Sequence, residues 1–167
     1  MPFVLRKIRK AKWYKHRGVP WLAQGDLQAD ALGDLQTSNN ELSVYYIESN
    51  KSNLERVVTA LAANRDFISN LDYALLDLEV LSELGIKTER RAGETPDAQV
   101  NTWHIDLVEL SAHKLMDLAD AIYKHADKRR LQKKKLIQLI VKAVTSKCID
   151  GTRLSPELSK EIDKSLG

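Results

Sequence analysis

The chain has 167 residues, of which 43% are hydrophobic and 29% charged, and this size and composition suit one domain with a core of its own. Its single cysteine, Cys148, excludes an intramolecular disulfide and a cysteine-based zinc site. No stretch approaches the roughly 18 uninterrupted apolar residues of a membrane span, and no apolar signal-peptide region follows the basic N-terminus. We therefore expect one cytoplasmic domain over residues 1–167 that does not enter a membrane.

Charge is distributed unevenly along the chain, although the net charge is only +3. Residues 1–20 carry seven Lys or Arg and no acid, residues 21–123 carry seven against eighteen Asp or Glu, and residues 124–167 carry twelve against five. The basic ends therefore either meet an acidic partner or fold back on the acidic middle. The composition leaves both possibilities open.

The first forty residues indicate little regular structure. Residues 3–14 mix apolar and basic side chains and fit either an edge strand or a short helix. Residues 18–40 are rich in Gly, Asp, Gln and Asn, which indicates an irregular segment that Trp13 and Trp21 pin to the core. We interpret residues 1–20 as a basic arm in front of an acidic α/β part, residues 21–110.

The acidic part is expected to hold the sheet. Residues 42–48 are β-branched and aromatic and predict a strand, and apolar residues at helical spacing predict an amphipathic helix over residues 54–65. Residues 71–84 fit either a helix or a buried strand followed by a turn, and we favour a strand that begins near Tyr73. Residues 100–109 alternate and predict another strand. About three strands would then form one small mixed or antiparallel sheet.

Residues 111–167 are expected to be helical and basic. Ser111 is a suitable N-cap for an amphipathic helix. Asp127 is interpreted as the cap of a further helix that carries the apolar residues of 136–144, and whether these are one bent helix or two stays open. A proline at the first helical position predicts a terminal helix over residues 156–166. Strands first and helices last predict the α+β class.

The N-terminal arm interleaves basic side chains with two aromatic rings. Cations that contact phosphates and rings that stack on bases are typical of sites for single-stranded nucleic acid. The run continues through residues 15–17. The candidate binding residues of this arm are Arg6, Lys7, Arg9, Lys10, Lys12, Trp13 and Tyr14.

A second basic cluster lies near residues 124–135, where a helix would align several cations along a phosphate backbone. A solvated helix face is the alternative interpretation, and the acidic middle of the chain would repel a polyanion. Beside Lys124, its candidate binding residues are Lys128, Arg129, Arg130, Lys133, Lys134 and Lys135.

His104 and Asp106 are the candidate catalytic pair. On a strand they share one face, whereas Trp103, Ile105 and Leu107 share the other. An imidazole beside a carboxylate suits acid–base chemistry. The alternative is a polar sheet face, because spacing places no nucleophile or third metal ligand beside the pair.

Three aspartates, Asp26, Asp30 and Asp34, recur at a spacing of four and would align on one helical face or fold over the His104 face. The alternating ligands of a calcium loop are absent, so a solvated acidic face is the simpler interpretation. We expect no metal and no cofactor.

Known catalytic signatures are missing from the sequence: it has no Walker or Rossmann glycine loop, no Gly-x-Ser-x-Gly elbow and no His-Glu-x-x-His. We expect a non-catalytic accessory or regulatory protein that binds another macromolecule through charge-segregated surfaces, with a protein as the first choice of partner. The first alternative is a nucleic-acid-binding protein that uses the basic arm and the basic helix near 124–135. The second is a small hydrolase or transferase centred on His104 and Asp106.

Overall fold

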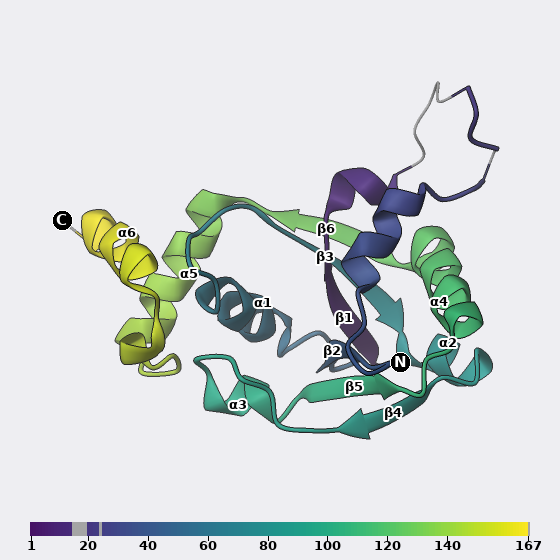
Figure 1. The fold of residues 1–167 in the computed structure, drawn as a ribbon. Helices are drawn as coiled ribbons and strands as arrows, with labels where there is room; N and C mark the ends of the chain where they lie inside the picture. Colours follow the sequence, from purple (N-terminus) through teal and green to yellow (C-terminus); the bar gives the residue numbers. More distant parts are fainter. Residues whose placement is uncertain (15–19, 24, 167) are drawn as a thin grey trace.

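The computed structural model describes residues 1–14, 20–23 and 25–166. Within these ranges six strands form one antiparallel sheet in the order β4-β5-β2-β1-β3-β6 (Figure 1). The class is α+β, as predicted, but the sheet is twice as large as the expected three strands. The strands are β1 (Phe3–Ile8), β2 (Leu42–Ile47), β3 (Leu71–Asp77), β4 (Lys87–Arg90), β5 (His104–Val108) and β6 (Asp127–Leu131).

The first strand, β1, lies in the middle of the sheet. It pairs with β3 along its whole length, from Phe3 opposite Asp77 to Ile8 opposite Asp72. Its pairing with β2 covers only three positions and ends where Leu5 lies opposite Tyr45. The main-chain pairing of β1 is therefore complete on the side of β3 and incomplete on the side of β2.

Helices cover both faces of the sheet (Figure 1). In each of the longer helices, apolar residues recur at helical spacing and form the face that packs on the rest of the protein. The α-helices are α1 (Leu54–Ala63), α2 (Leu78–Glu83), α3 (Ala98–Asn101), α4 (Ala112–His125), α5 (Lys133–Thr145) and α6 (Pro156–Leu166). The 3₁₀ helices are η1 (Lys10–Trp13), η2 (Ala29–Leu35) and η3 (Gly151–Arg153).

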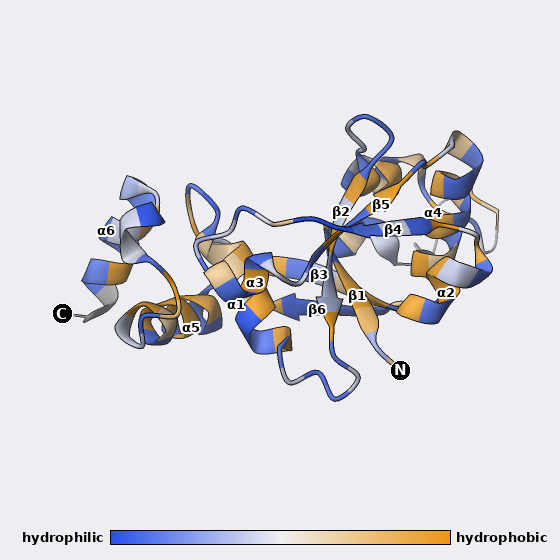
Figure 2. Ribbon diagram, turned by 90° about the horizontal axis from the view of Figure 1, so that it is seen from below, coloured by the Kyte–Doolittle hydropathy of each residue, from blue (hydrophilic) through white to orange (hydrophobic). Residues whose placement is uncertain are grey.

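The core is divided by the sheet into two clusters. One face packs against α2, α4, η1 and η2 and buries Trp13 and Leu118 almost completely. The other face packs against α1 and α3. Helix α5 packs on α1, and α6 packs on α5, so these three helices extend outward from the sheet (Figure 2). No helix in the described ranges is long and apolar enough to cross a lipid bilayer.

Several predicted elements are confirmed. The strand over 42–48, the helix over 54–65, the helix capped by Ser111 and the helix over 156–166 are all present. The Ser111 side chain accepts a hydrogen bond from Lys114 N, as an N-cap does. Residues 3–14 form a strand followed by a 3₁₀ turn, but this strand lies in the middle of the sheet and not at its edge as predicted, and residues 18–40, predicted to be irregular, contain η2.

Other predictions are corrected. Asp127 begins strand β6 and not a helix, so the segment from 124 to 135 comprises a helix end, a strand and a helix start. Residues 71–84 combine both alternatives, because β3 ends at Asp77, whose side chain then caps α2. Residues 98–101 form a short helix before β5, and β4 is a strand where none was expected.

Candidate anion-binding cleft

The sheet opens between β1 and β2 at the point where their pairing ends. Continuing the register would place Lys7 opposite Ser43, but the ladder stops at Leu5 and Tyr45. The Arg6 guanidinium fills the gap: Nη1 donates to Ser43 O at 2.8 Å, and Nε and Nη2 donate to Asp34 O at 3.0 and 2.7 Å. A side chain thus replaces main-chain pairing here.

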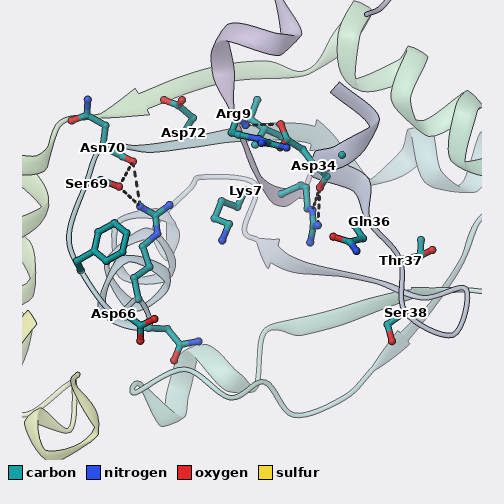
Figure 3. A pocket seen from close by; sticks show the side chains of 16 residues that line it. Lys7, Arg9, Asp34, Gln36, Thr37, Ser38, Asp66, Ser69, Asn70 and Asp72 are labelled. Atoms are coloured by element: carbon teal, nitrogen blue, oxygen red, sulfur yellow. Dashed lines mark hydrogen bonds and ion pairs between the residues drawn. The ribbon is translucent and has the colours of Figure 1, made fainter. Parts of the chain in front are cut away.

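Beside this opening lies a cleft with a volume of about 960 Å³ (Figure 3). Its floor is the end of β1, and its walls are the segment 33–38 on one side and the loop 64–70 on the other. Alternation along β1 places Lys7 on the face opposite to Arg6. Lys7 is exposed and lies between Asp34 on one wall and Ser69 and Asn70 on the other (Figure 3).

Arg65 completes a group of three cations in this cleft. It follows the end of α1, and its Nη1 donates to Ser69 Oγ and Asn70 O, both at 3.2 Å. Among the described residues, neither Arg6 nor Arg65 has a carboxylate within ion-pair distance, and Lys7 makes no hydrogen bond or ion pair. The positive charge of these three groups is therefore not neutralised by salt bridges.

The two buried acidic residues of the cleft form their ion pairs with other arginines. Asp34 binds Arg9, with Oδ1 accepting from Nε at 2.6 Å. Asp72 binds Arg130, with Oδ1 accepting from Nε at 2.7 Å. Asp66 is the remaining carboxylate of the lining, and it lies exposed on the loop. Among the described lining residues, three cations without an ion pair, Arg6, Lys7 and Arg65, thus face one carboxylate without an ion pair, Asp66.

The pKa values report the same imbalance. The cleft walls reduce hydration of the Lys7 ammonium and lower its pKa, and repulsion from Arg65 and Arg6 lowers it further against an opposing effect of Asp34. Burial likewise lowers the pKa of Arg6 and of Arg65, and in each case it outweighs the attraction of a carboxylate, Asp34 for Arg6 and Asp72 for Arg65. A bound anion would relieve these penalties, because it would replace lost hydration and screen the like charges.

The arm of the chain is tied to the body through Asp34. Its carboxylate is buried and accepts from Arg9 N at 2.6 Å and from Trp13 Nε1 at 2.8 Å, both through Oδ2. Asp72 performs a similar role and accepts from Lys10 N at 3.0 Å. Burial alone would raise the pKa of the Asp72 carboxyl, but the bonds from Arg130 and Lys10 outweigh it and lower the pKa.

The candidate residues of the N-terminal arm therefore have different environments. Arg6 and Lys7 belong to the cleft, whereas the Trp13 ring is fully buried and presents no surface to a ligand. Tyr14 is 44% exposed, and Lys10 Nζ lies 5.1 Å from the centre of its ring.

Two further cations of the arm face acids of the middle segment: Arg9 binds Asp34, and Lys12 Nζ lies 3.8 Å from Asp30 Oδ2. Residues 15–19 of the arm lie outside the described residues.

Most cations of the second cluster also bind neighbouring groups. Lys128 Nζ donates to three main-chain carbonyls at the end of α4, those of Ile122, Tyr123 and Ala126, at 2.9 to 3.1 Å. Burial lowers the pKa of this ammonium. The Lys128 side chain therefore caps the C-terminal end of α4 from strand β6, next to the C-cap residue Ala126.

The other members of the cluster divide into paired and unpaired cations. Arg129 binds Asp127 at 3.0 Å, Arg130 binds Asp72, Lys124 binds Asp120 at 2.6 Å, and Lys133 binds Glu161. Lys134 and Lys135 are exposed at the start of α5 and have no partner among the described residues. Asn70 Oδ1 accepts from Lys133 N at 2.9 Å, which joins this end of α5 to the cleft wall.

His104 and Asp106 lie on β5, side by side and outside the cleft. Both are 8% exposed. His104 Nε2 lies 3.6 Å from Asp106 Oδ1, and its Nδ1 lies 3.2 Å from Arg91 O. Asp106 Oδ1 accepts from Ser43 Oγ at 3.0 Å, and its Oδ2 lies 3.7 Å from Arg91 Nη1. The pair is thus part of a polar network across β2, β5 and the end of β4.

Two expectations around this pair need revision. Ile105 and Leu107 share a core face, as predicted, but Trp103 precedes the strand and packs against the other cluster. His104 contacts Tyr45, Arg91 and Asp106, and it makes no hydrogen bond, ion pair or ring contact with the described residues of the segment 18–40.

The aspartate series is also dispersed: Asp26 precedes η2, Asp30 is exposed, and Asp34 is buried against Arg9. The described ranges contain no group of three or more His, Cys, Asp or Glu that suits a metal ion.

No pattern in the sequence indicates that the loop 64–70 forms a wall of the cleft. Arg65 is predicted only as the end of a helix, and Arg65 and Phe67 lie almost sixty residues from β1 in an ordinary polar stretch. Only the pairing of β1 with β3 brings this loop to the strand that carries Lys7. No family model, curated protein or solved structure shows significant similarity to the chain.

Proposed function

We propose that this protein is a non-catalytic binding protein whose cleft takes the phosphate groups of a nucleic acid. The observation that carries the proposal is that Arg6, Lys7 and Arg65 line one cleft and that none of them forms an ion pair with an acid among the described residues. Cations that gather in one cleft at the expense of hydration are explained by a ligand that supplies the missing negative charge.

The geometry of the donors supports phosphate as that charge. Among the described residues Arg65 donates only through Nη1, so its Nε and Nη2 are available to a ligand. A guanidinium fork and a nearby ammonium are a common combination for phosphate oxygens. The remaining lining is rich in side-chain amides and hydroxyls, namely Gln36, Thr37, Ser38, Asn64, Ser69 and Asn70.

Binding without catalysis is supported by what surrounds the cations. The two buried carboxylates of the cleft, Asp34 and Asp72, each accept hydrogen bonds from an arginine and a main-chain amide, so neither is placed as a general base. The His104 and Asp106 pair lies outside the lining. The cleft therefore offers charge and hydrogen bonds and no acid–base pair.

Fluorescence anisotropy of labelled oligonucleotides tests this proposal. At low salt we expect saturable binding that weakens as salt is raised, because phosphate contacts release counterions. Lys7→Gln and Arg65→Gln should each weaken binding several-fold and reduce the salt slope by about one unit. Lys87→Gln and Arg90→Gln are matched controls, because both side chains are exposed on the edge strand β4 away from the cleft, and each should leave binding unchanged.

A protein partner, the first choice from composition, is the competing outcome. An acidic peptide such as oligoglutamate, measured in the same assay, distinguishes the two. Binding of the peptide without binding of any oligonucleotide would replace the nucleic-acid proposal with an acidic protein segment. Equal loss in cleft and control variants would show only a general charge effect and would remove the cleft from the proposal.

A further inference from the structure

We infer that the ligand of this cleft is a single strand, one of whose bases stacks on Phe67. This inference rests on the proposed function. Phe67 is 67% exposed and lines the cleft on the same loop as Arg65. The other large hydrophobic side chains that are exposed among the described residues, namely Met1, Tyr14, Trp21 and Met116, lie outside the lining.

The loop that carries Phe67 is held in place on both sides of the ring. Arg65 Nη1 donates to Asn70 O at 3.2 Å, and Asn70 Oδ1 accepts from Lys133 N at 2.9 Å. The carbonyl of Asp66 accepts a hydrogen bond from Ser155 Oγ, and Ile68 is buried. Both neighbours of Phe67 are thus anchored, and the Phe67 side chain itself is exposed. An exposed ring on an anchored loop is a suitable stacking platform, because the loop need not be ordered on binding.

The cleft favours a single strand over a duplex. Lys7 lies on the floor between two walls, and Arg6 reaches the opening between β1 and β2. A stiff duplex cannot bend its phosphates into such a recess, whereas a flexible strand can place one phosphate on the floor and turn an adjacent base outward to the rim. In a duplex, moreover, the base faces are already stacked on one another and are not available to Phe67.

Exposed amides of the walls supply contacts for the edge of that base. Gln36 stands on one wall, and Asn64 stands on the other beside Arg65. Neither side-chain amide makes a hydrogen bond within the described residues. Each offers donors and an acceptor, which suits the edge of an unpaired base.

The test compares oligothymidine with an abasic strand of the same length, because the two share phosphates and differ in bases. Phe67→Ala should weaken binding of oligothymidine roughly five- to 100-fold, which corresponds to the usual contribution of one stacked base, and should leave binding of the abasic strand unchanged. Phe67→Trp should retain binding of oligothymidine. Trp21→Ala, which removes an exposed ring outside the lining, should affect neither strand.

The outcomes separate this inference from the function on which it rests. If both strands bind equally and Lys7→Gln weakens both while Phe67→Ala weakens neither, the stacking inference is overturned and the phosphate-binding function stands. Tighter binding of a duplex than of the matching single strand would also overturn it. If no strand binds even at low salt, the proposed function itself fails. Circular dichroism of Phe67→Ala, whose side chain is exposed, confirms that the variant is folded.

Discussion

The indole of Trp13 donates its Nε1–H to Asp34 Oδ2 at 2.8 Å in the interior of the protein, and the same oxygen accepts from Arg9 N. This bond joins the basic arm to the acidic middle of the chain. Composition left open whether the basic arm meets an acidic partner or folds back on the acidic middle of the chain. Arg9 and Trp13 fold back on the acidic middle, because both bind Asp34. Lys7 is the exception in this arm, and it lines the cleft together with Arg6 and Arg65.

Trp13 is predicted to stabilise the fold and not to contact a ligand. Trp13→Ala should lower the free energy of unfolding by about 3–5 kcal/mol, since it leaves a cavity and removes the hydrogen bond that Trp13 Nε1 donates to Asp34. Trp21→Ala is the matched control, because Trp21 is 74% exposed, and it should change stability by less than about 0.5 kcal/mol. Urea unfolding measures both. Equal effects of the two substitutions would contradict the assignment of Trp13 to the core.

Lys7 is predicted to lower stability slightly in the unbound protein. Its pKa is below the ordinary 10.5, so the folded state disfavours the charged form. That penalty applies at pH values below the folded pKa and disappears as the pH rises toward 10.5. Lys7→Gln should therefore raise the melting temperature slightly at neutral pH, and the difference should shrink in alkaline solution. A clear loss of stability at neutral pH would contradict an unpaired cation at this position.

Asp72 has the opposite dependence on pH. Its pKa lies below the ordinary 3.8, so the pair with Arg130 stabilises the fold above pH 3.8 and loses this effect as the pH falls through the folded pKa. Asp72→Asn should cost about 1–2 kcal/mol at neutral pH, and the wild type and the variant should converge below pH 3.8. Denaturant unfolding at a series of pH values measures this difference. Asp30→Asn is the control, because that side chain is 82% exposed and its substitution should have little effect at any pH.

Lys128 is predicted to stabilise α4 through its three carbonyl contacts. Lys128→Met keeps most of the apolar part of the side chain and removes the ammonium, so it should cost about 1–2 kcal/mol. Lys134→Met makes the same chemical change at an exposed position without a partner among the described residues, and its effect should be within about 0.5 kcal/mol. Thermal unfolding of the two variants measures the difference. A destabilisation that is no larger for Lys128 would contradict its role as a helix cap.

The elements that could be predicted from the sequence are those that bury one regular face. Strand β2 and helices α1, α4 and α6 place apolar residues at the period of their own structure, and this period is visible without a partner. Strands β4 and β6 lack that signal. They read KTER and DKRRL because they are the two edges of the sheet, where charged side chains meet solvent and discourage pairing with other chains.

The candidate site was predictable only in part, for a related reason. The sequence identified Arg6 and Lys7 within a basic run, but it offered nothing to distinguish them from Arg9 and Lys12, whose acidic partners lie far along the chain. Whether a cation is paired depends on register and on loop placement. The pairing of β1 with β3 brings Arg65 and Phe67 to Lys7, and that pairing is a property of the whole sheet.

The central place of β1 in the sheet affects how the molecule folds. This strand precedes both of its neighbours in the chain, and it alone joins β4, β5 and β2 to β3 and β6. The central strand β1 is therefore synthesised before the strands that it connects. The sheet cannot be completed until residues 127–131, which form β6, have also been synthesised. Folding is governed by contacts distant in sequence, which are slow to form. A substitution in β1 can change the rate of folding as well as the affinity of the cleft, because Arg6 and Lys7 belong to this strand. The refolding rate and the affinity of such a variant are therefore measured separately.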